Sequence, residues 1–228
     1  MTNLCPLRDK DSGQNNKNGA VNVLVFFKQK LTMLAVPKTG TTAYETKLRP
    51  LADIAFRKGT KHMTMGKYHS RLAPFLQETY RQNPERLAVM RDPVDVIRSW
   101  YKYRSPDRMG DNPYCHGGVS FDEFVLDVIS DNPSKPAGVG SQRAFLSIPG
   151  GIVPVHHLFA YEHQRALRDF LSERFEREIE PKPKNVSPSI PAPISPEVER
   201  KLRTARAPEF ELYDQIIQAG GVLRAYIG

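Results

Sequence analysis

The chain alternates between short apolar runs and longer segments in which apolar residues recur every three or four positions. The short runs are rich in Val, Leu, Ile and Phe, and polar or turn-forming residues separate them. Runs of this length and composition are typical of buried β-strands. They predict strands at 21–27, 31–36, 54–56, 62–65, 87–91 and 153–159.

The longer periodic segments predict helices. Their expected ranges are 41–48, 70–82, 93–103, 121–130, 142–146, 162–175, 196–205 and 208–219. Ser120 and Glu123 have the spacing of a capping box, and Ser195 stands before a first-turn proline, Pro196. Gly220 is placed to end the last helix.

This alternation predicts an α/β fold: a single three-layer domain with a mostly parallel central sheet flanked by helices. The polar composition of residues 1–19 predicts a disordered tail, and the domain is expected to span 20–228. In such sheets ligands bind beyond the carboxyl ends of the strands. Candidate chemistry is therefore expected where apolar runs end.

The clearest candidate follows the run at 31–36. It consists of Pro37, Lys38, Thr39, Gly40, Thr41 and Thr42. A strand, a short glycine-containing turn and a helix start direct backbone N–H groups and the helix dipole at one point, and Lys38 adds a full positive charge. This is an anion cradle. Its order differs from G-x-x-x-x-G-K-[ST], the nucleoside-triphosphate loop, because Lys38 precedes Gly40.

A second candidate follows the run at 87–91. Arg91 ends that run, Asp92 and Pro93 open a helix, and Ser99 lies eight residues after Arg91. A guanidinium at a strand end can make a two-pronged contact with a phosphate. The alternative for Arg91 is a salt bridge with Asp92 or Asp95, and the alternative for Ser99 is a neutral helix residue.

Together the two candidates resemble the cofactor motifs of the sulfotransferases. Those enzymes bind 3′-phosphoadenosine 5′-phosphosulfate (PAPS) through a P-K-[ST]-G-[TS]-T loop and an R-[DE]-P motif followed by a helical serine. The resemblance implies a P-loop NTPase-like fold, with residues 37–42 on the 5′-phosphosulfate and Arg91 and Ser99 on the 3′-phosphate. It further implies that Lys38 stabilises charge on the transferring group, without a metal.

Sulfuryl transfer to a hydroxyl or amine requires a base for the acceptor's proton. His62 stands in a Lys-His-Met sequence that partly matches a family motif carrying a catalytic histidine. Glu45 lies near the start of the first expected helix, where it would face the cradle, and several carbohydrate sulfotransferases use a glutamate as the base. The alternatives are a hydrogen-bonded structural histidine and a glutamate that pairs with the helix dipole. Two further segments, 138–143 and 159–162, resemble glycan-type bacterial sulfotransferases, and Gln142 and Arg143 are candidates for ligand contact or for a cap and a surface charge.

Composition changes this interpretation little. The formal net charge is +8 and the pI is about 9.5, which suits an anionic donor and an anionic acceptor. Neither the two cysteines nor the six histidines have a metal-site spacing, and no run reaches the roughly twenty apolar residues of a membrane span. The expectation is a cytoplasmic enzyme without an integral membrane segment or a nucleic-acid partner, whose acceptor is a carbohydrate or small metabolite.

Two other functions fit parts of the sequence. A P-loop kinase is disfavoured by the missing G-K-[ST] order. A non-catalytic protein that binds anions or nucleic acid would rest on net charge alone, because no dense basic block flanked by aromatic residues is present. The proline-rich segments at 104–119 and 180–196 are either plain connectors or loops over the ligand.

Overall fold

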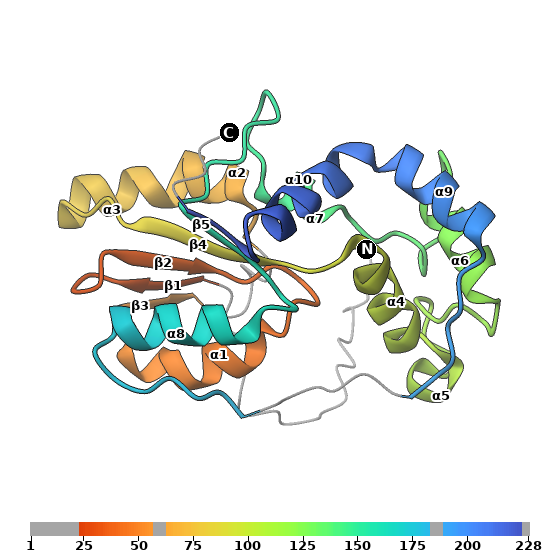
Figure 1. The fold of residues 1–228 in the computed structure, drawn as a ribbon, viewed down its shortest axis with the longest axis horizontal. Coiled ribbons are helices and arrows are strands. Elements are labelled where there is room, and N and C mark those ends of the chain that lie inside the picture. Colours follow the sequence, from red (N-terminus) through yellow and green to blue (C-terminus); the bar gives the residue numbers. More distant parts are fainter. Residues whose placement is uncertain (1–22, 57–62, 183–188, 225–228) are drawn as a thin grey trace, which may run out of the picture.

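A mixed β-sheet forms the centre of the molecule (Figure 1). The computed structural model describes residues 23–56, 63–182 and 189–224, and these residues form six strands in the order β3-β1-β2-β4-β5-β6. The strands are β1 (Val23–Phe26), β2 (Leu31–Leu34), β3 (Ile54–Phe56), β4 (Glu85–Met90), β5 (His157–Ala160) and β6 (Val222–Arg224).

The prediction of a mostly parallel sheet is wrong. Among the described strands, β2 pairs with β4 and β4 with β5 in parallel, whereas β1 is antiparallel to both β2 and β3, and β6 is antiparallel to β5. The antiparallel pairing of β1 with β2 follows from the turn at 27–30, in which the Lys30 N–H donates to the Phe27 carbonyl at 3.1 Å. A turn this short can join only antiparallel neighbours. The parallel part of the sheet is its middle, where both candidate motifs lie.

Helices cover both faces of the sheet, which confirms the α/β class. The helices α1 (Thr41–Leu48) and α8 (Gln164–Arg174) share one apolar core with the sheet. The opposite core includes side chains of α2 (Met65–Lys67), the π-helical turn η2 (Tyr68–Leu72), α3 (Ala73–Tyr80), α7 (Gln142–Leu146) and α10 (Ala207–Gln218). The short 3-10 turn η1 (Arg49–Leu51) follows α1 directly.

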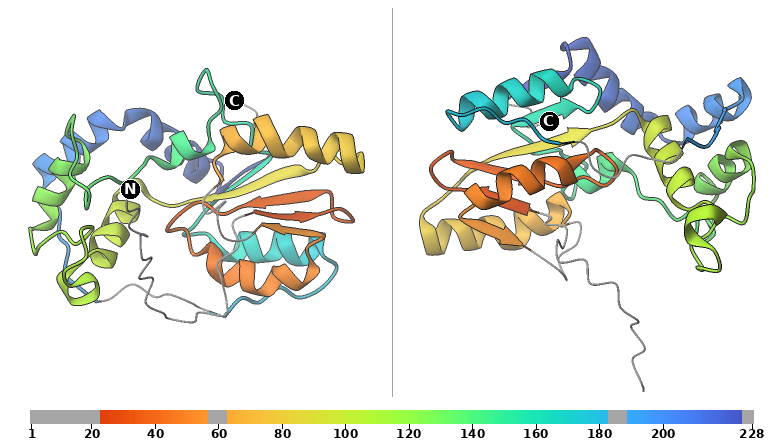
Figure 2. Two further views of the ribbon diagram at one scale, coloured as in Figure 1. Left: turned by 180° about the vertical axis from the view of Figure 1, so that it is seen from behind. Right: turned by 90° about the horizontal axis from the view of Figure 1, so that it is seen from below.

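A further group of helices lies beyond the carboxyl end of β4 (Figure 2). It contains α4 (Pro93–Tyr103), α5 (Pro106–Met109), α6 (Phe121–Val128) and α9 (Pro196–Ala205), and we call it the helical lobe. Buried side chains of α4, α6 and α9, together with Phe210 of α10, form its own apolar core. The lobe faces the edge of the sheet at which both motifs were expected.

The local helix signals are confirmed. Ser120 and Glu123 form a reciprocal capping box at the start of α6, and the Ser195 hydroxyl accepts from the Val198 N–H at the start of α9. The last helix ends at Gly220 and Gly221, which have positive φ and whose N–H groups bond back to the carbonyls of Ile217 and Ile216.

One predicted strand is wrong, two elements were not predicted, and two predictions fall outside the residues that the structure describes. The strand at 62–65 is wrong over its described part, because Thr64 caps a helix through Lys67 N–H (3.4 Å) and fully buried Met65 begins α2. The helix α5 and the strand β6 were not predicted. His62 and the tail at 1–19 lie outside the described residues.

Candidate anion site at the carboxyl ends of β2 and β4

The loop between β2 and α1 has the backbone of an anion cradle. Lys38 and Gly40 both have a φ of 67°, in the left-handed region, and α1 begins directly afterwards at Thr41. Left-handed backbone is uncommon for a residue with a side chain, and it concentrates where function requires it. The first N–H groups of a helix have no partner within the helix. In α1 the Ala43 N–H bonds back to the Gly40 carbonyl at 3.2 Å, which leaves those of Thr41 and Thr42 as the candidates for a ligand.

Thr39 holds the loop in this shape. Its hydroxyl donates to the Val36 carbonyl at 2.8 Å, and its side chain is almost fully buried. The hydroxyl of Thr39 is therefore committed to the loop itself, so any contact of Thr39 with a ligand must come from its backbone N–H.

Gly40 lies against Tyr161, the residue that follows β5. A Cβ added at Gly40 would stand 2.7 Å from Cε2 of the Tyr161 ring, which is closer than two carbon atoms can approach without displacement. A glycine is needed here for two reasons, the positive φ and the contact with the ring.

The same tyrosine connects the loop to the second motif. The Arg91 guanidinium carbon lies 4.7 Å from the centre of the Tyr161 ring. Arg91 follows β4, the strand beside β2, so the end of the first motif and the start of the second meet on one aromatic ring. The predicted juxtaposition of the two motifs is therefore present in the described structure.

The Arg91 guanidinium is only weakly paired with carboxylates and hydrogen-bond acceptors of the protein. Its Nη2 lies 3.9 Å from Asp95 Oδ2, at the outer limit of an ion pair, and the same carboxylate also pairs with Arg98. Its Nε is buried without a hydrogen-bond partner. A buried N–H of a charged group without an acceptor is costly, and an anionic ligand would supply the missing acceptor.

The backbone around Arg91 is fixed by the side chain of Gln142, the first residue of α7. The Arg91 N–H donates to Gln142 Oε1 at 2.9 Å, and Gln142 Nε2 donates back to the Arg91 carbonyl at 2.8 Å. The Gln142 N–H donates in turn to Glu209 Oε1 at 2.7 Å. Gln142 is 3% exposed, so it positions Arg91 and does not point into solvent.

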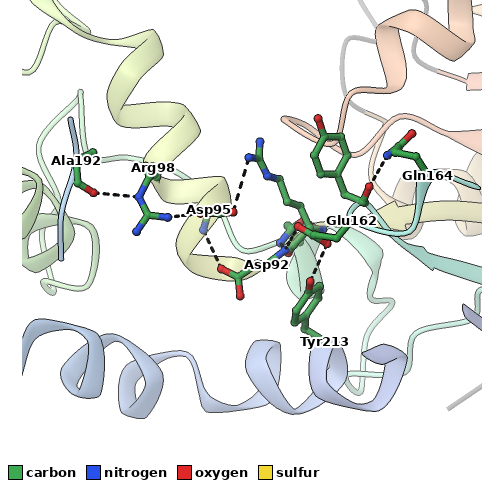
Figure 3. A network of polar contacts seen from close by, with 10 residues as sticks. Asp92, Asp95, Arg98, Glu162, Gln164, Ala192 and Tyr213 are labelled. Carbon is green, nitrogen blue, oxygen red and sulfur yellow. Dashed lines mark hydrogen bonds and ion pairs between the residues drawn. The ribbon is translucent and has the colours of Figure 1, made fainter. Parts of the chain in front are cut away.

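A second network fixes the turn that opens α4 (Figure 3). Asp92 Oδ1 caps the helix by accepting from the Asp95 N–H at 2.9 Å, and its own N–H donates to Glu162 Oε1 at 3.2 Å. The Tyr213 hydroxyl of α10 donates to Glu162 Oε2 at 2.7 Å. Burial raises the pKa of the Asp92 carboxyl, because charge is disfavoured away from water.

The Lys38 ammonium lies over two aromatic rings of α4. Its Nζ is 4.8 Å from the centre of the Trp100 ring and 4.2 Å from that of Tyr103. Burial, followed by the positive charges of Arg108, Arg104 and Arg91, lowers the pKa of Lys38 to about 8. Three arginines thus lie close enough to act on the Lys38 charge, and we call Lys38, Arg91, Arg104 and Arg108 the cationic cluster; an anion beside the ammonium would relieve this repulsion.

The other predicted residues occupy α1, α4 and the start of the loop. Thr41 and Glu45 are buried one helical turn apart on α1, and Thr42 between them is half-buried. Ser99 is buried on α4 and takes part in an interaction within the protein. Arg143 lies outside the cradle, donating from Nη2 to the Gly151 carbonyl at 3.1 Å.

A cavity of about 290 Å³ opens beside the cradle. It is lined by Pro37, Thr64, Val96, Trp100, Gly140, Ser141, Gln142, Ala144 and Phe145. Pro37 starts the cradle loop, and Trp100 is one of the two rings beneath the Lys38 ammonium. The cavity and the cationic cluster therefore share a wall.

Sequence reasoning missed the aromatic and basic residues that surround Lys38. These are Trp100, Tyr103, Arg104 and Arg108. The three-residue spacing of Trp100 and Tyr103 on a helix carries a signal, because it places both rings on one face. Arg108 comes from α5, which was not predicted, and the only signal was that its segment, 104–119, could be a loop over the ligand.

Comparison of the chain with protein-family models, with curated proteins and with solved structures found no match. Within residues 23–56, 63–182 and 189–224, no cluster of three or more His, Cys, Asp or Glu side chains has a geometry that could bind a metal ion. None of the helices in these ranges combines the length and hydrophobicity required to cross a membrane.

Proposed function

We propose that the protein transfers a sulfuryl group from PAPS to a hydroxyl or amine of an acceptor, using a P-loop-like sulfotransferase fold. One observation carries the proposal: the cradle at 37–42 and the incompletely paired Arg91 stand on neighbouring parallel strands and meet at Tyr161. Two anion sites joined by one aromatic ring suit a nucleotide that has a phosphate group at each end of its ribose.

The residues divide between the two ends of the donor. The N–H groups of residues 39–42 and the α1 dipole would hold the 5′-phosphosulfate. Arg91 would take the 3′-phosphate through Nε and a terminal nitrogen, which gives its buried Nε the acceptor it lacks. Ser99, buried eight residues further along on α4, would add a hydroxyl donor.

PAPS supplies an activated sulfuryl group, whose sulfur is joined through one oxygen to a phosphate. The acceptor oxygen forms a bond to sulfur while that bridging S–O bond breaks and its electrons stay with the phosphate. Lys38 would stabilise the charge that grows on the leaving oxygen. Its ammonium already lies where Arg91, Arg104 and Arg108 add positive potential.

The acceptor's proton must leave during this step. Glu45 is the candidate base among the described residues, because it is buried on the same face of α1 as Thr41, one turn from the cradle. His62 remains the other candidate, and it lies outside the described residues.

A nucleotide titration tests the proposal. We expect the desulfonated product, 3′-phosphoadenosine 5′-phosphate (PAP), to raise the melting temperature more than adenosine 5′-monophosphate does, because only PAP engages Arg91. Arg91→Ala should remove this preference, weakening PAP binding by roughly 10- to 100-fold, the range for a charge-assisted phosphate contact. Arg71→Ala is the matched control, since Arg71 is exposed on η2.

Transfer of labelled sulfate from PAPS to an acceptor library would complete the assignment. Stabilisation by Mg-ATP in preference to PAP would instead support a kinase. Salt-dependent binding to DNA without any affinity for PAP would support a nucleic-acid-binding protein.

A further inference from the structure

The cavity beside the cradle has a composition that restricts what it can hold. None of the nine residues that line it, all of them described, carries a charge. Five contribute apolar surface: Pro37, Val96, Trp100, Ala144 and Phe145. This contrasts with the cationic cluster on the other side of the shared wall, where Lys38 stands over Trp100.

The polar groups of the lining are few and already partly engaged. The amide of Gln142 is bonded at both ends to the Arg91 backbone. The Thr64 hydroxyl accepts from the Lys67 N–H and that of Ser141 accepts from the Ala144 N–H, so each can still donate one O–H. The described side chains of the lining thus offer about two hydroxyl donors to an occupant.

We infer that this cavity is the acceptor pocket and that it takes a compact, uncharged ring compound with a single hydroxyl, such as a phenol or an aromatic alcohol. This inference rests on the proposed function. The volume of about 290 Å³ is at the small end for ligand sites and fits one or two fused rings. The Phe145 ring supplies apolar surface to an occupant, and so does the part of the Trp100 indole that Lys38 and Arg104, at 4.8 and 4.6 Å from the ring centre, leave uncovered.

A saccharide fits the same lining poorly. Each sugar ring has several hydroxyls, and burying a hydroxyl without a hydrogen-bond partner disfavours binding. With two hydroxyl donors on its walls, the cavity would leave most of them unbonded. A polyanionic glycan would in addition bring charges against uncharged walls. The pocket therefore selects against the carbohydrate acceptors that the sequence resemblance implies.

The placement of the pocket suits the reaction. An acceptor stacked on Trp100 with its hydroxyl toward Pro37 would present its oxygen at the start of the cradle loop, next to Lys38. Its oxygen would bond to the donor's sulfur, the bridging S–O bond would break toward PAP, and its proton would pass to the base and then to water.

Trp100 allows a direct test, because it is the only tryptophan of the chain. In the presence of saturating PAP, para-nitrobenzyl alcohol should quench its fluorescence with saturation, since the nitroaromatic ring would stack on the indole. Methyl galactoside at the same concentration should not compete with this probe. With PAPS in place of PAP, sulfate should be transferred to the alcohol and not to the sugar.

Filling the pocket separates this inference from the proposed function. Ala144 is an exposed part of the lining, so Ala144→Trp should block the cavity without disturbing a core. We expect kcat/KM for para-nitrobenzyl alcohol to fall at least roughly 10-fold, while stabilisation by PAP is unchanged. Ala219→Trp, at an exposed alanine of the helix end after α10, is the control.

Transfer to methyl galactoside or to a sulfated glycan in preference to the aromatic alcohol would overturn the inference and leave the proposed function intact. Unchanged kcat/KM in Ala144→Trp would also overturn it. Absence of any stabilisation by PAP in the unmodified protein would overturn the proposed function, and with it this inference.

Discussion

At the scale of single residues, the cradle depends on two left-handed positions, Lys38 and Gly40. For a residue with a side chain this conformation costs about 1–2 kcal/mol, because Cβ approaches the following carbonyl oxygen. Lys38 adopts it nonetheless, and its ammonium then reaches Trp100 and Tyr103. Gly40 avoids the cost and leaves room for the Tyr161 ring.

Gly40→Ala should therefore weaken PAP binding at least roughly 10-fold, because the new methyl group displaces the ring that joins the loop to Arg91. Gly117→Ala is the matched control. Gly117 has the same φ of 67°, but a Cβ there would meet nothing within 4 Å. Isothermal titration with PAP distinguishes the two effects, and equal affinity in both variants would contradict the role given to Tyr161.

At the scale of elements, a chain of hydrogen bonds connects α10 to the end of β4 through α7. Glu209 of α10 accepts from the Gln142 N–H. The Gln142 side chain in turn bonds to both the N–H and the carbonyl of Arg91. Glu209 is 3% exposed and lies 3.5 Å from Arg206. Two helices far apart in the sequence, α7 and α10, thus both contribute to the position of one arginine.

Glu209→Ala should lower the free energy of unfolding by about 1–3 kcal/mol, because it leaves the buried Gln142 N–H without an acceptor. It should also weaken PAP binding while Arg91 itself is unchanged. Chemical denaturation and PAP titration measure the two effects. Glu211→Ala, an exposed carboxylate on the same helix, should change neither, and an unaltered PAP affinity in Glu209→Ala would show that the connection is only structural.

At the scale of the whole molecule, the site gathers cations from separate segments: Lys38 from the cradle, Arg91 from the end of β4, Arg104 from the end of α4 and Arg108 from α5. In the folded protein these charges and burial lower the pKa of Lys38 to about 8 from a usual 10.5. Between these two values the unfolded chain binds more protons than the folded one, so Lys38 contributes a gain in stability as the pH rises through this window.

Donor binding should have the opposite pH dependence. PAP needs the Lys38 ammonium, and the phosphates are fully ionised above neutral pH, with a second pKa of about 6. The dissociation constant of PAP should therefore be nearly constant between about pH 7 and about pH 8 and rise up to about 10-fold per unit above pH 8. Titration calorimetry across this range measures the effect.

Lys38→Met should bind PAP more weakly and without this pH dependence. Lys47→Met, at an exposed lysine of α1, should behave like the unmodified protein. A PAP affinity that is flat through about pH 9 in the unmodified protein would contradict a direct contact with Lys38.

The sequence predicts helices better than strand directions, for a physical reason. The bounds of α1, α4, α7 and α9 match the predicted ranges. Caps, prolines and the three- to four-residue spacing of apolar side chains, all of them local to the segment, determine these bounds. The antiparallel direction of β1 follows from the short turn at 27–30, whereas that of β6 depends on its pairing with β5, information that a three-residue apolar segment does not contain. The strand expected at 62–65 failed because Thr64 offered a helix cap.

The candidate site divides in the same way. Pro37–Thr42, Arg91 and Ser99 could be found from the sequence because each belongs to a contiguous strand–turn–helix pattern. Tyr161, Arg104 and Arg108 could not, because their relation to Lys38 and Arg91 exists only after α4, α5 and β5 have packed around the cradle.

The contact of Tyr161 with both Gly40 and Arg91 has a consequence for folding. These three residues follow β5, β2 and β4, whose parallel pairing joins segments far apart in the sequence through long crossover connections. A fragment that ends before β5 would lack the ring, even with both motifs intact. Affinity for the ligand thus reports on the completed topology, and a refolding chain should regain it only in its final kinetic phase.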